Sequence, residues 1–312
     1  MSAPGTMRRS RLTAAILAIL LLAAPSYTSG APGTPSPQAS FRGGESLKYQ
    51  LQWLGIPLAT VRLSAEGPIR WNGKRVFRYR ARLKSIGLLK RLYRVDDHAE
   101  SHADARGLFS YRIDIRQKEG RYRARKWNIF EKWRTVYGRK KRPPRYYEIF
   151  GELNDILSAI YKARSLDLQP GREEDIYVFQ EKYLYRVFLR VTGIERIDTL
   201  WGPVRALVVQ PRIAGKSRLN DLATTWIWVT ADEFHVPVRL ESRTYVGPFV
   251  SHLMETRGIP SGLLAKTPSR TMKTWKPKTK RVKVEARGRA SHIKKLLGRS
   301  KRLPKKSLPK KK

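Results

Sequence analysis

The chain contains no cysteine, and this absence removes several kinds of chemistry. Without a thiol, its 312 residues form no disulfide, thiolate nucleophile or cysteine-ligated zinc or iron–sulfur centre. The chain also lacks the G-x-S-x-G, H-E-x-x-H and Walker-type motifs of common hydrolases, zinc proteases and nucleotide-binding proteins. The sequence therefore favours a non-enzymatic protein, and we expect no cofactor.

Acidic residues are scarce as well. The chain has 25 Asp and Glu against 65 Lys and Arg, a formal net charge of +40. From residue 259 onward there are twenty bases and one acid, Glu285, and the segment 41–258 carries eighteen more bases than acids. Because a charge this large attracts partners of opposite sign, we expect the protein to contact an anionic envelope surface or lipid.

Long hydrophobic runs are missing. The longest, LTAAILAILLLAA at 12–24, is shorter than the roughly 20 residues that a membrane-spanning helix needs. Arg8, Arg9 and Arg11 precede it, and the small residues of APS at 24–26 follow it. This order is typical of a signal peptide, so we predict export to the periplasm or cell envelope, with an uncleaved anchor as the alternative.

Composition divides the rest of the chain. Residues 1–26 are the predicted signal peptide, and 27–40, rich in Pro, Ser and Gly, are a predicted flexible linker. Residues 41–258 have the patterned hydrophobicity of a folded, β-rich domain. Residues 259–312 are basic and have no sustained period, which predicts a disordered tail.

The stretch RVFRYRARLK at 75–84 shows the pattern of the domain. Successive side chains of a strand point to opposite faces, so alternating residues separate into two sets. One set is apolar: Phe77, Tyr79, Ala81 and Leu83. The other is basic: Arg78, Arg80, Arg82 and Lys84. A disordered nucleic-acid-binding arm has no reason to keep this register, so the spacing indicates a strand with a basic outer face.

Similar alternation predicts many further strands, at 45–55, 57–67, about 91–101, 108–118, 121–130, 174–180, 182–192, 203–213, 224–230, 236–246 and 248–256. The Asn-Gly dipeptide in WNGK at 71–74 predicts a tight hairpin. One segment has helical spacing, which predicts a central helix at about 153–165 with Asn154 or Asp155 as its N-cap. The fold class is therefore mainly β, a large curled antiparallel sheet forming an open or half-closed barrel with one helix.

The order of several motifs resembles a known family. These motifs are FRGGESLKYQLQWLGIPLATVRL, SIGLLKRLYRVDDHAES, NDILSAIYKARSL, GIERIDTLWGPVRALVVQP, WIWVTADEFHVPVRLES and VGPFVSHL. Over about residues 41–256 the chain is similar to exported bacterial proteins grouped as domain of unknown function 3108. The resemblance implies an envelope protein with a β-rich domain and a central helix, and it brings no catalytic residues.

Aromatic residues on the predicted strands are candidate ligand contacts. We expect Tyr49, Trp53, Phe77 and Tyr79 to point to the inside of the curled sheet. There they either line a cavity for an apolar chain or fill a solid core. Basic residues would then contact the head group of a lipid-like ligand.

The segment VDDHAESH at 95–102 is the densest polar cluster. On a strand, Asp96, His98 and Glu100 share one face, and His98 and Glu100 are close enough in sequence to reach one metal ion. The alternative is a polar strand face paired with neighbouring arginines.

Three functions remain open. The leading one is an envelope binding or scaffolding protein, and the others are an envelope enzyme acting on glycan or lipid through Asp96, His98 and Glu100, and a polyanion binder acting through its tail. Nucleic-acid binding is disfavoured, because alternation places the bases and the aromatic rings on opposite faces.

Overall fold

The computed structural model describes residues 41–149, 151–215, 223–259 and 264. The predicted signal peptide and linker, and the predicted tail apart from Ile259 and Leu264, lie outside these residues. Leu264 is buried in the main hydrophobic cluster. In the described ranges, no helix has the length and apolar content needed to cross a membrane.

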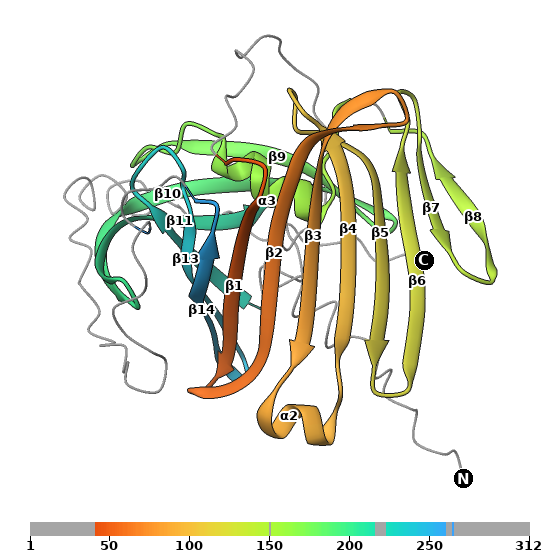
Figure 1. Cartoon of the computed structure of the whole chain (residues 1–312). Coiled ribbons are helices and arrows are strands. Elements are labelled where there is room, and N and C mark those ends of the chain that lie inside the picture. Colours follow the sequence, from red (N-terminus) through yellow and green to blue (C-terminus); the bar gives the residue numbers. More distant parts are fainter. Residues whose placement is uncertain (1–40, 150, 216–222, 260–263, 265–312) are drawn as a thin grey trace, which may run out of the picture. The chain divides into compact units, whose positions relative to one another are not determined.

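One fourteen-stranded antiparallel sheet makes up most of the described chain (Figure 1). Its strands are β1 (Glu45–Trp53), β2 (Ile56–Trp71), β3 (Lys74–Ser85), β4 (Asp96–Asp104), β5 (Ser110–Glu119), β6 (Tyr122–Phe130), β7 (Thr135–Arg139), β8 (Arg142–Tyr147), β9 (Glu173–Gln180), β10 (Tyr183–Thr199), β11 (Gly202–Ile213), β12 (Ala223–Thr230), β13 (Pro237–Thr244) and β14 (Gly247–Arg257). The two helices are α2 (Gly87–Leu92) and α3 (Ile156–Arg164).

The strand order is β8-β7-β6-β5-β4-β3-β2-β1-β14-β13-β12-β11-β10-β9. Strands that are consecutive in the sequence pair with each other, apart from β8 and β9, which form the two edges of the sheet. In addition, the first strand, β1, pairs with the last, β14. The sheet is therefore curled but not closed, which confirms the predicted fold class. The β9–β10 turn still contacts β6: Lys126 Nζ lies 2.5 Å from Glu181 Oε1, and Asn128 Nδ2 donates to the Glu181 carbonyl at 3.0 Å.

Local sequence explains the regular elements. In β3 every apolar residue of the 77–83 set is buried, and Arg80, Arg82 and Lys84 are exposed, as the alternation predicts. The β2–β3 turn places Asn72 at φ 47° and Gly73 at φ 76°, the left-handed geometry that makes Asn-Gly a hairpin signal.

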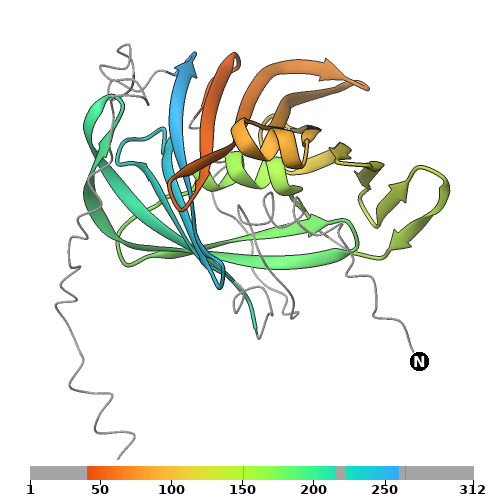
Figure 2. The same cartoon turned by 90° about the horizontal axis from the view of Figure 1, so that it is seen from below.

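Helix α3 lies between the two arms of the curled sheet, next to β3 and β4 on one side and β9 on the other (Figure 2). Asp155, one of the two candidates predicted from the sequence, is its N-cap. Its Oδ1 accepts from the backbone N of Leu157 at 2.7 Å and of Ser158 at 3.1 Å. Its Oδ2 accepts from Ser101 Oγ at 2.5 Å and Ser110 Oγ at 2.7 Å, so one carboxylate caps the helix and attaches it to β4 and β5.

Four elements differ from the predictions, namely α2, β4, β7 and β8. The strand expected at about 91–101 begins only at Asp96, because residues 87–92 form α2. Strands β7 and β8 were not predicted. β8 contains Pro143 and Pro144, which cannot donate ladder hydrogen bonds, and it is tolerated because it lies at the sheet edge.

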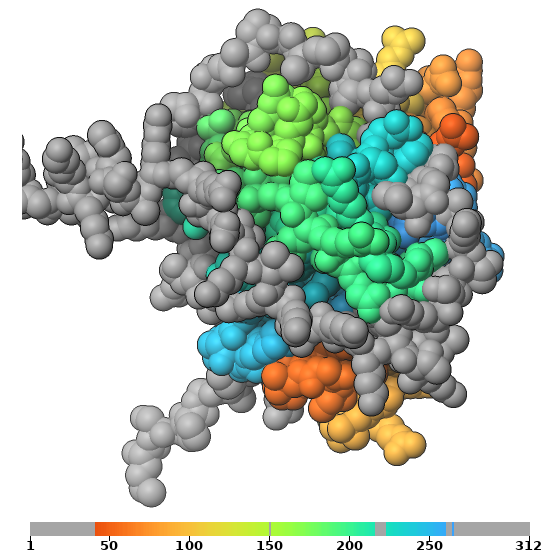
Figure 3. Space-filling model, turned by 90° about the vertical axis from the view of Figure 1, so that its left-hand side faces the viewer, coloured from red at the N-terminus to blue at the C-terminus, as the bar shows by residue number. Residues whose placement is uncertain are grey.

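Figure 3 shows the side of the molecule on which β9–β11, in green, are seen. Along the lower edge of this view three connections follow one another. They are the β13–β14 turn in blue, the β1–β2 turn in orange, and the β3–β4 connection with α2 in amber. In an antiparallel order these three connections must lie at the same end of the sheet.

Candidate functional site

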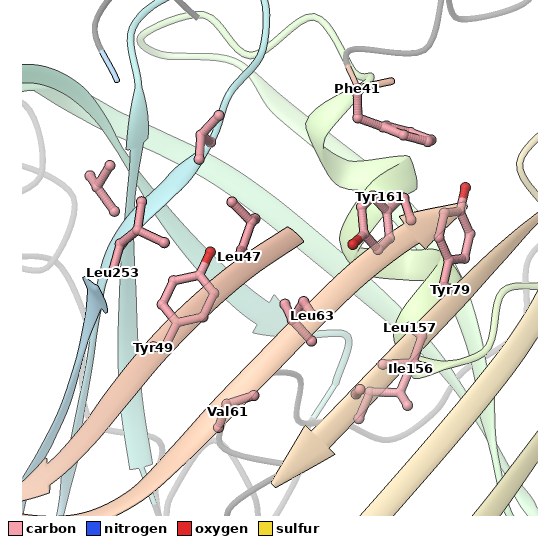
Figure 4. Close-up of a cluster of buried hydrophobic side chains, with 14 of the residues drawn as sticks. Phe41, Leu47, Tyr49, Val61, Leu63, Tyr79, Ile156, Leu157, Tyr161 and Leu253 are labelled. Atoms are coloured by element: carbon pink, nitrogen blue, oxygen red, sulfur yellow. The ribbon is translucent and has the colours of Figure 1, made fainter. Parts of the chain in front are cut away.

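Phe77 and Tyr79 lie in a packed aromatic cluster inside the curl. Figure 4 shows Tyr79 beside Tyr161. The rings of Tyr79 and Tyr161 stack with centroids 4.1 Å apart and planes 7° apart. Phe41 meets Phe77 and Tyr161 edge to face, each at 4.9 Å. These rings fill space rather than line it, so this part of the interior is a solid core.

Two hydroxyl groups in this cluster have no hydrogen-bond partner among the residues that the structure describes. Tyr79 Oη and Tyr161 Oη are buried and make no hydrogen bond within the described residues. Burial raises the pKa of both phenols well above the usual range, so both are neutral. A buried hydroxyl without a hydrogen-bond partner lowers the stability of the folded protein.

Tyr49 lines a separate apolar cavity. It has a volume of about 100 Å³ and lies between β1 and β2, α3, and strands β10–β14. Its walls are mainly aliphatic, including Leu63, Ala163, Leu189 and Val209. Tyr49 Oη donates to the Pro237 carbonyl at 2.9 Å, which leaves the ring free to contact the cavity. For comparison, an apolar cavity of about 150 Å³ holds benzene.

Trp53 lies outside the cavity, at the end of β1. Its indole N donates to the Val246 carbonyl at 3.0 Å, and its ring stacks on Phe249 at 6.5 Å. Of the four aromatic residues predicted from the sequence to contact a ligand, the structure therefore brings only Tyr49 to the cavity.

A buried ion pair stands beside the cavity. Arg164, the last residue of α3, lines it and is bound to Glu45 of β1, with both side chains almost fully buried. The sequence carries a signal for this pair, because Arg164 continues the apolar stripe of the helix, and a charge on a buried stripe needs a buried partner.

Asp96, His98 and Glu100 share the outer face of β4, as predicted. Asp96 accepts from Arg82 Nε at 3.1 Å, and Glu100 accepts from Arg80 Nε at 2.8 Å. His98 Nε2 lies 3.2 Å from Asp96 Oδ1. Partial burial, with the Arg82 charge adding to it, lowers the pKa of His98.

Arginines thus engage both carboxylates, which leaves them poorly placed to bind a metal or act as a base. Among the described residues, no group of three or more His, Asp or Glu side chains is arranged to hold a metal ion. The geometry favours the interpretation of this cluster as a polar strand face paired with arginines.

The outer face carries a feature that sequence reasoning missed, a row of basic side chains in register. Arg62 is opposite Arg82, Arg82 opposite His98, His98 opposite Arg116, and Arg116 opposite Arg125. Lys140 follows, its backbone N donating to the Arg125 carbonyl at 2.9 Å. We call these six residues the basic row. It lines a surface hollow of about 800 Å³ whose carboxylates are Glu100 and Asp114.

The half of the basic row that comprises Arg116, Arg125 and Lys140 has no paired carboxylates among the described residues. In the part of the chain that the structure describes, Arg116, Arg125 and Lys140 form no ion pair, whereas Arg62 and Arg82 pair with Glu255 and Asp96. Like charges directly opposite one another on a sheet are destabilising, and Arg116 and Arg125 are such a pair.

Residues 48–254 match the model of a family described as protein of unknown function DUF3108. The chain belongs to this family. The match confirms the resemblance seen in the motifs, and with it comes no described activity. No curated protein matches the chain.

Solved structures extend the fold comparison. A β-barrel-like protein of domain of unknown function DUF1849 from Brucella abortus is similar with a TM-score of 0.50 at 9% identity, over 70% of this chain and 98% of its own. A provisionally assigned exported protein of YmcC-like fold from Bacteroides fragilis covers 71% of this chain and 99% of its own at 9% identity, but its TM-score is 0.30. The first likeness supports a shared β-barrel-like fold.

Proposed function

We propose that this DUF3108 protein is exported to the bacterial envelope, where it binds a short apolar group, such as the end of an acyl chain, in the cavity beside α3. The observation that carries the proposal is the aliphatic cavity with Tyr49 and Arg164 in its wall. The arginine-rich, then apolar, then small-residue order of residues 1–26 supports export.

The cavity volume limits the size of the group that can bind. About 100 Å³ accommodates a few carbon atoms, so most of a longer ligand would remain outside. An empty apolar cavity costs about 24 cal/mol per Å³, or roughly 2 kcal/mol here, and a ligand or a larger side chain recovers this free energy.

Native mass spectrometry of gently extracted protein tests the proposal. We expect the wild type to carry a bound apolar molecule and Ala163→Leu, which fills the cavity, to lose it. Ala163 and Ala231 pack against the same group of buried aliphatic side chains, but Ala231 does not line the cavity. Ala231→Leu is therefore the matched control and should keep the ligand. An empty wild-type protein, or equal ligand content in the two variants, contradicts the proposal.

The basic row favours a second candidate function, binding of an extended polyanion across the outer face. Adjacent strands are about 4.8 Å apart, so Arg116 and Arg125, with Lys140 next to them, present three cations at short intervals. The twenty bases after residue 258 support the same kind of partner, an anionic envelope surface.

Polyphosphate binding by the full chain can distinguish the contribution of the basic row from that of the basic tail. Arg116→Gln with Arg125→Gln should weaken binding at low salt and flatten its salt dependence. Arg190 and Arg205 are exposed and lie outside the hollow, so Arg190→Gln with Arg205→Gln is the control of equal charge. Equal losses from the two double variants would remove the second candidate.

A further inference from the structure

One end of the sheet exposes apolar side chains from three separate connections. They are Leu54 of the β1–β2 turn and Ile56 at the start of β2, Leu88 and Leu92 of α2, and Tyr245 and Val246 of the β13–β14 turn. We call these six residues the end patch. The exposed fractions of Leu88, Leu92 and Tyr245 are 59%, 76% and 88%. Scattered exposed apolar residues are ordinary, but a group confined to one end calls for an explanation.

Hydrogen bonds place the three connections side by side. Leu54 N donates to the Pro248 carbonyl at 3.3 Å, which joins the β1–β2 turn to the start of β14. Ile86 N donates to the Leu58 carbonyl at 2.8 Å, which joins the α2 connection to the start of β2. Figure 3 shows the same blue, orange and amber segments in sequence along its lower edge.

Helix α2 differs from most surface helices in that its apolar side chains are not buried. None of its six residues is buried, and Leu88 and Leu92, four positions apart, lie on one face that is exposed to solvent. A helix normally turns its apolar face to the core, so this one has an apolar face available for a partner.

The surroundings of the end patch are positively charged. Lys90, Arg91 and Arg94 are exposed and, within the described residues, form no ion pair. The segments 53–58, 85–95 and 244–250 contain no aspartate or glutamate. Trp53 and Tyr245 add aromatic rings with polar tips, the residue types that settle at the boundary between lipid tails and head groups.

We propose that the end patch docks on an anionic lipid bilayer, with its apolar side chains at the level of the upper acyl chains and Lys90, Arg91 and Arg94 among the head groups. Apolar tips surrounded by cations that have no ion-pair partner within the described ranges match the chemistry of such a surface. The residues of the end patch belong neither to the cavity wall nor to the basic row, and this inference does not depend on either.

The absence of native cysteine permits a site-specific test in the full chain. We label Leu92→Cys with a polarity-sensitive fluorophore and add mixed phosphatidylcholine–phosphatidylglycerol vesicles. Trp133 is exposed in the β6–β7 turn at the opposite end of the sheet, so labelled Trp133→Cys is the control. We expect a blue shift at position 92 and none at 133, and a weaker response with phosphatidylcholine alone.

Vesicle co-sedimentation at high salt can distinguish membrane binding through the end patch from binding through the basic tail. At 0.5 M salt, where the Debye length is about 4 Å, attraction through the tail is largely screened. Under that condition Leu88→Ser with Leu92→Ser should weaken binding more than tenfold, whereas Trp133→Ser with Tyr146→Ser should leave it unchanged. Because α2 buries no residue, the first pair should melt at the wild-type temperature.

Three results would overturn the inference. The first is an equal label response at positions 92 and 133, which would mean that the tail alone holds the protein to the vesicles. The second is an unchanged affinity of the α2 double variant at high salt. The third is a concentration-dependent blue shift without lipid, which would make the end patch a contact between copies of this chain.

Discussion

Glu45 and Arg164, 119 positions apart, form an ion pair with two parallel hydrogen bonds in the interior. Arg164 Nη1 donates to Glu45 Oε1 at 2.6 Å and Nη2 to Oε2 at 2.9 Å, while Nε donates to the Phe234 carbonyl at 3.1 Å. The pair connects the first strand to the end of α3, and it lies beside the proposed ligand cavity.

Breaking this pair should be costly. Glu45→Gln leaves the Arg164 charge buried without a counter-charge, and we expect the free energy of unfolding to fall by about 3–5 kcal/mol in chemical denaturation. Asp167→Asn removes the partner of Arg172 in a pair that is more than half exposed, and it should cost less than about 1 kcal/mol. Equal losses in the two variants would show that Glu45 and Arg164 are not desolvated as described.

The buried tyrosines should respond in opposite directions. Tyr79→Phe removes an unpaired hydroxyl and should raise the free energy of unfolding by about 1 kcal/mol, whereas Tyr49→Phe removes the bond to the Pro237 carbonyl and should lower it by about 1 kcal/mol. Thermal or urea denaturation measures both. A stability loss in Tyr79→Phe would mean that its hydroxyl has a partner in solution.

Asp97 should make stability depend on pH. Burial raises the pKa of its carboxyl to about 7, although Lys118 N donates to Oδ1 at 2.7 Å. Since the folded pKa is above the unfolded value, this contribution is complete below about pH 4 and is lost as the pH rises to about 7.

We therefore expect Asp97→Asn, which keeps an acceptor for Lys118 N, to gain stability relative to the wild type across this pH range. About three pKa units correspond to at most about 4 kcal/mol. Urea denaturation at pH 4, 5.5 and 7.5 gives the comparison. A constant difference between the two proteins at all three pH values would rule out titration of Asp97.

The basic row should be a local source of instability. Arg116→Gln removes one of two like charges that face each other across β5 and β6, and should raise the free energy of unfolding by roughly 0.2–1 kcal/mol at low salt. Added salt should reduce the gain. Arg82→Gln is the control and should give no gain, because Arg82 is paired with Asp96. A gain of the same size in both variants would refute the assignment of repulsion to Arg116 and Arg125.

Local pattern predicted much of the fold. The alternation at 75–84, the Asn-Gly turn and the Asp155 cap each follow from sterics or hydrogen bonding within a few residues, so they can be read from one stretch of chain. Helix α2 was missed because GLLKRL is short and faces solvent, and β8 because its two prolines are tolerated only at a sheet edge.

The candidate sites were predicted less completely. Placing Tyr49, Phe77 and Tyr79 on the inner face required only strand period, but whether an inner residue meets a cavity or a solid core depends on what faces it. Tyr79 meets Tyr161 of α3, whereas Tyr49 meets an opening among strands far along the chain.

The amino-acid sequence by itself determined which side chains of the strands point inward, that a helix begins close to residues 154 and 155, and that the outer face is basic. These features depend on contacts between near neighbours. Only the tertiary structure decided that Glu45 meets Arg164, that six bases align across the strands, and that three apolar connections share one end. Those relationships depend on strand register and on the pairing of β1 with β14, which arise when distant segments pack together.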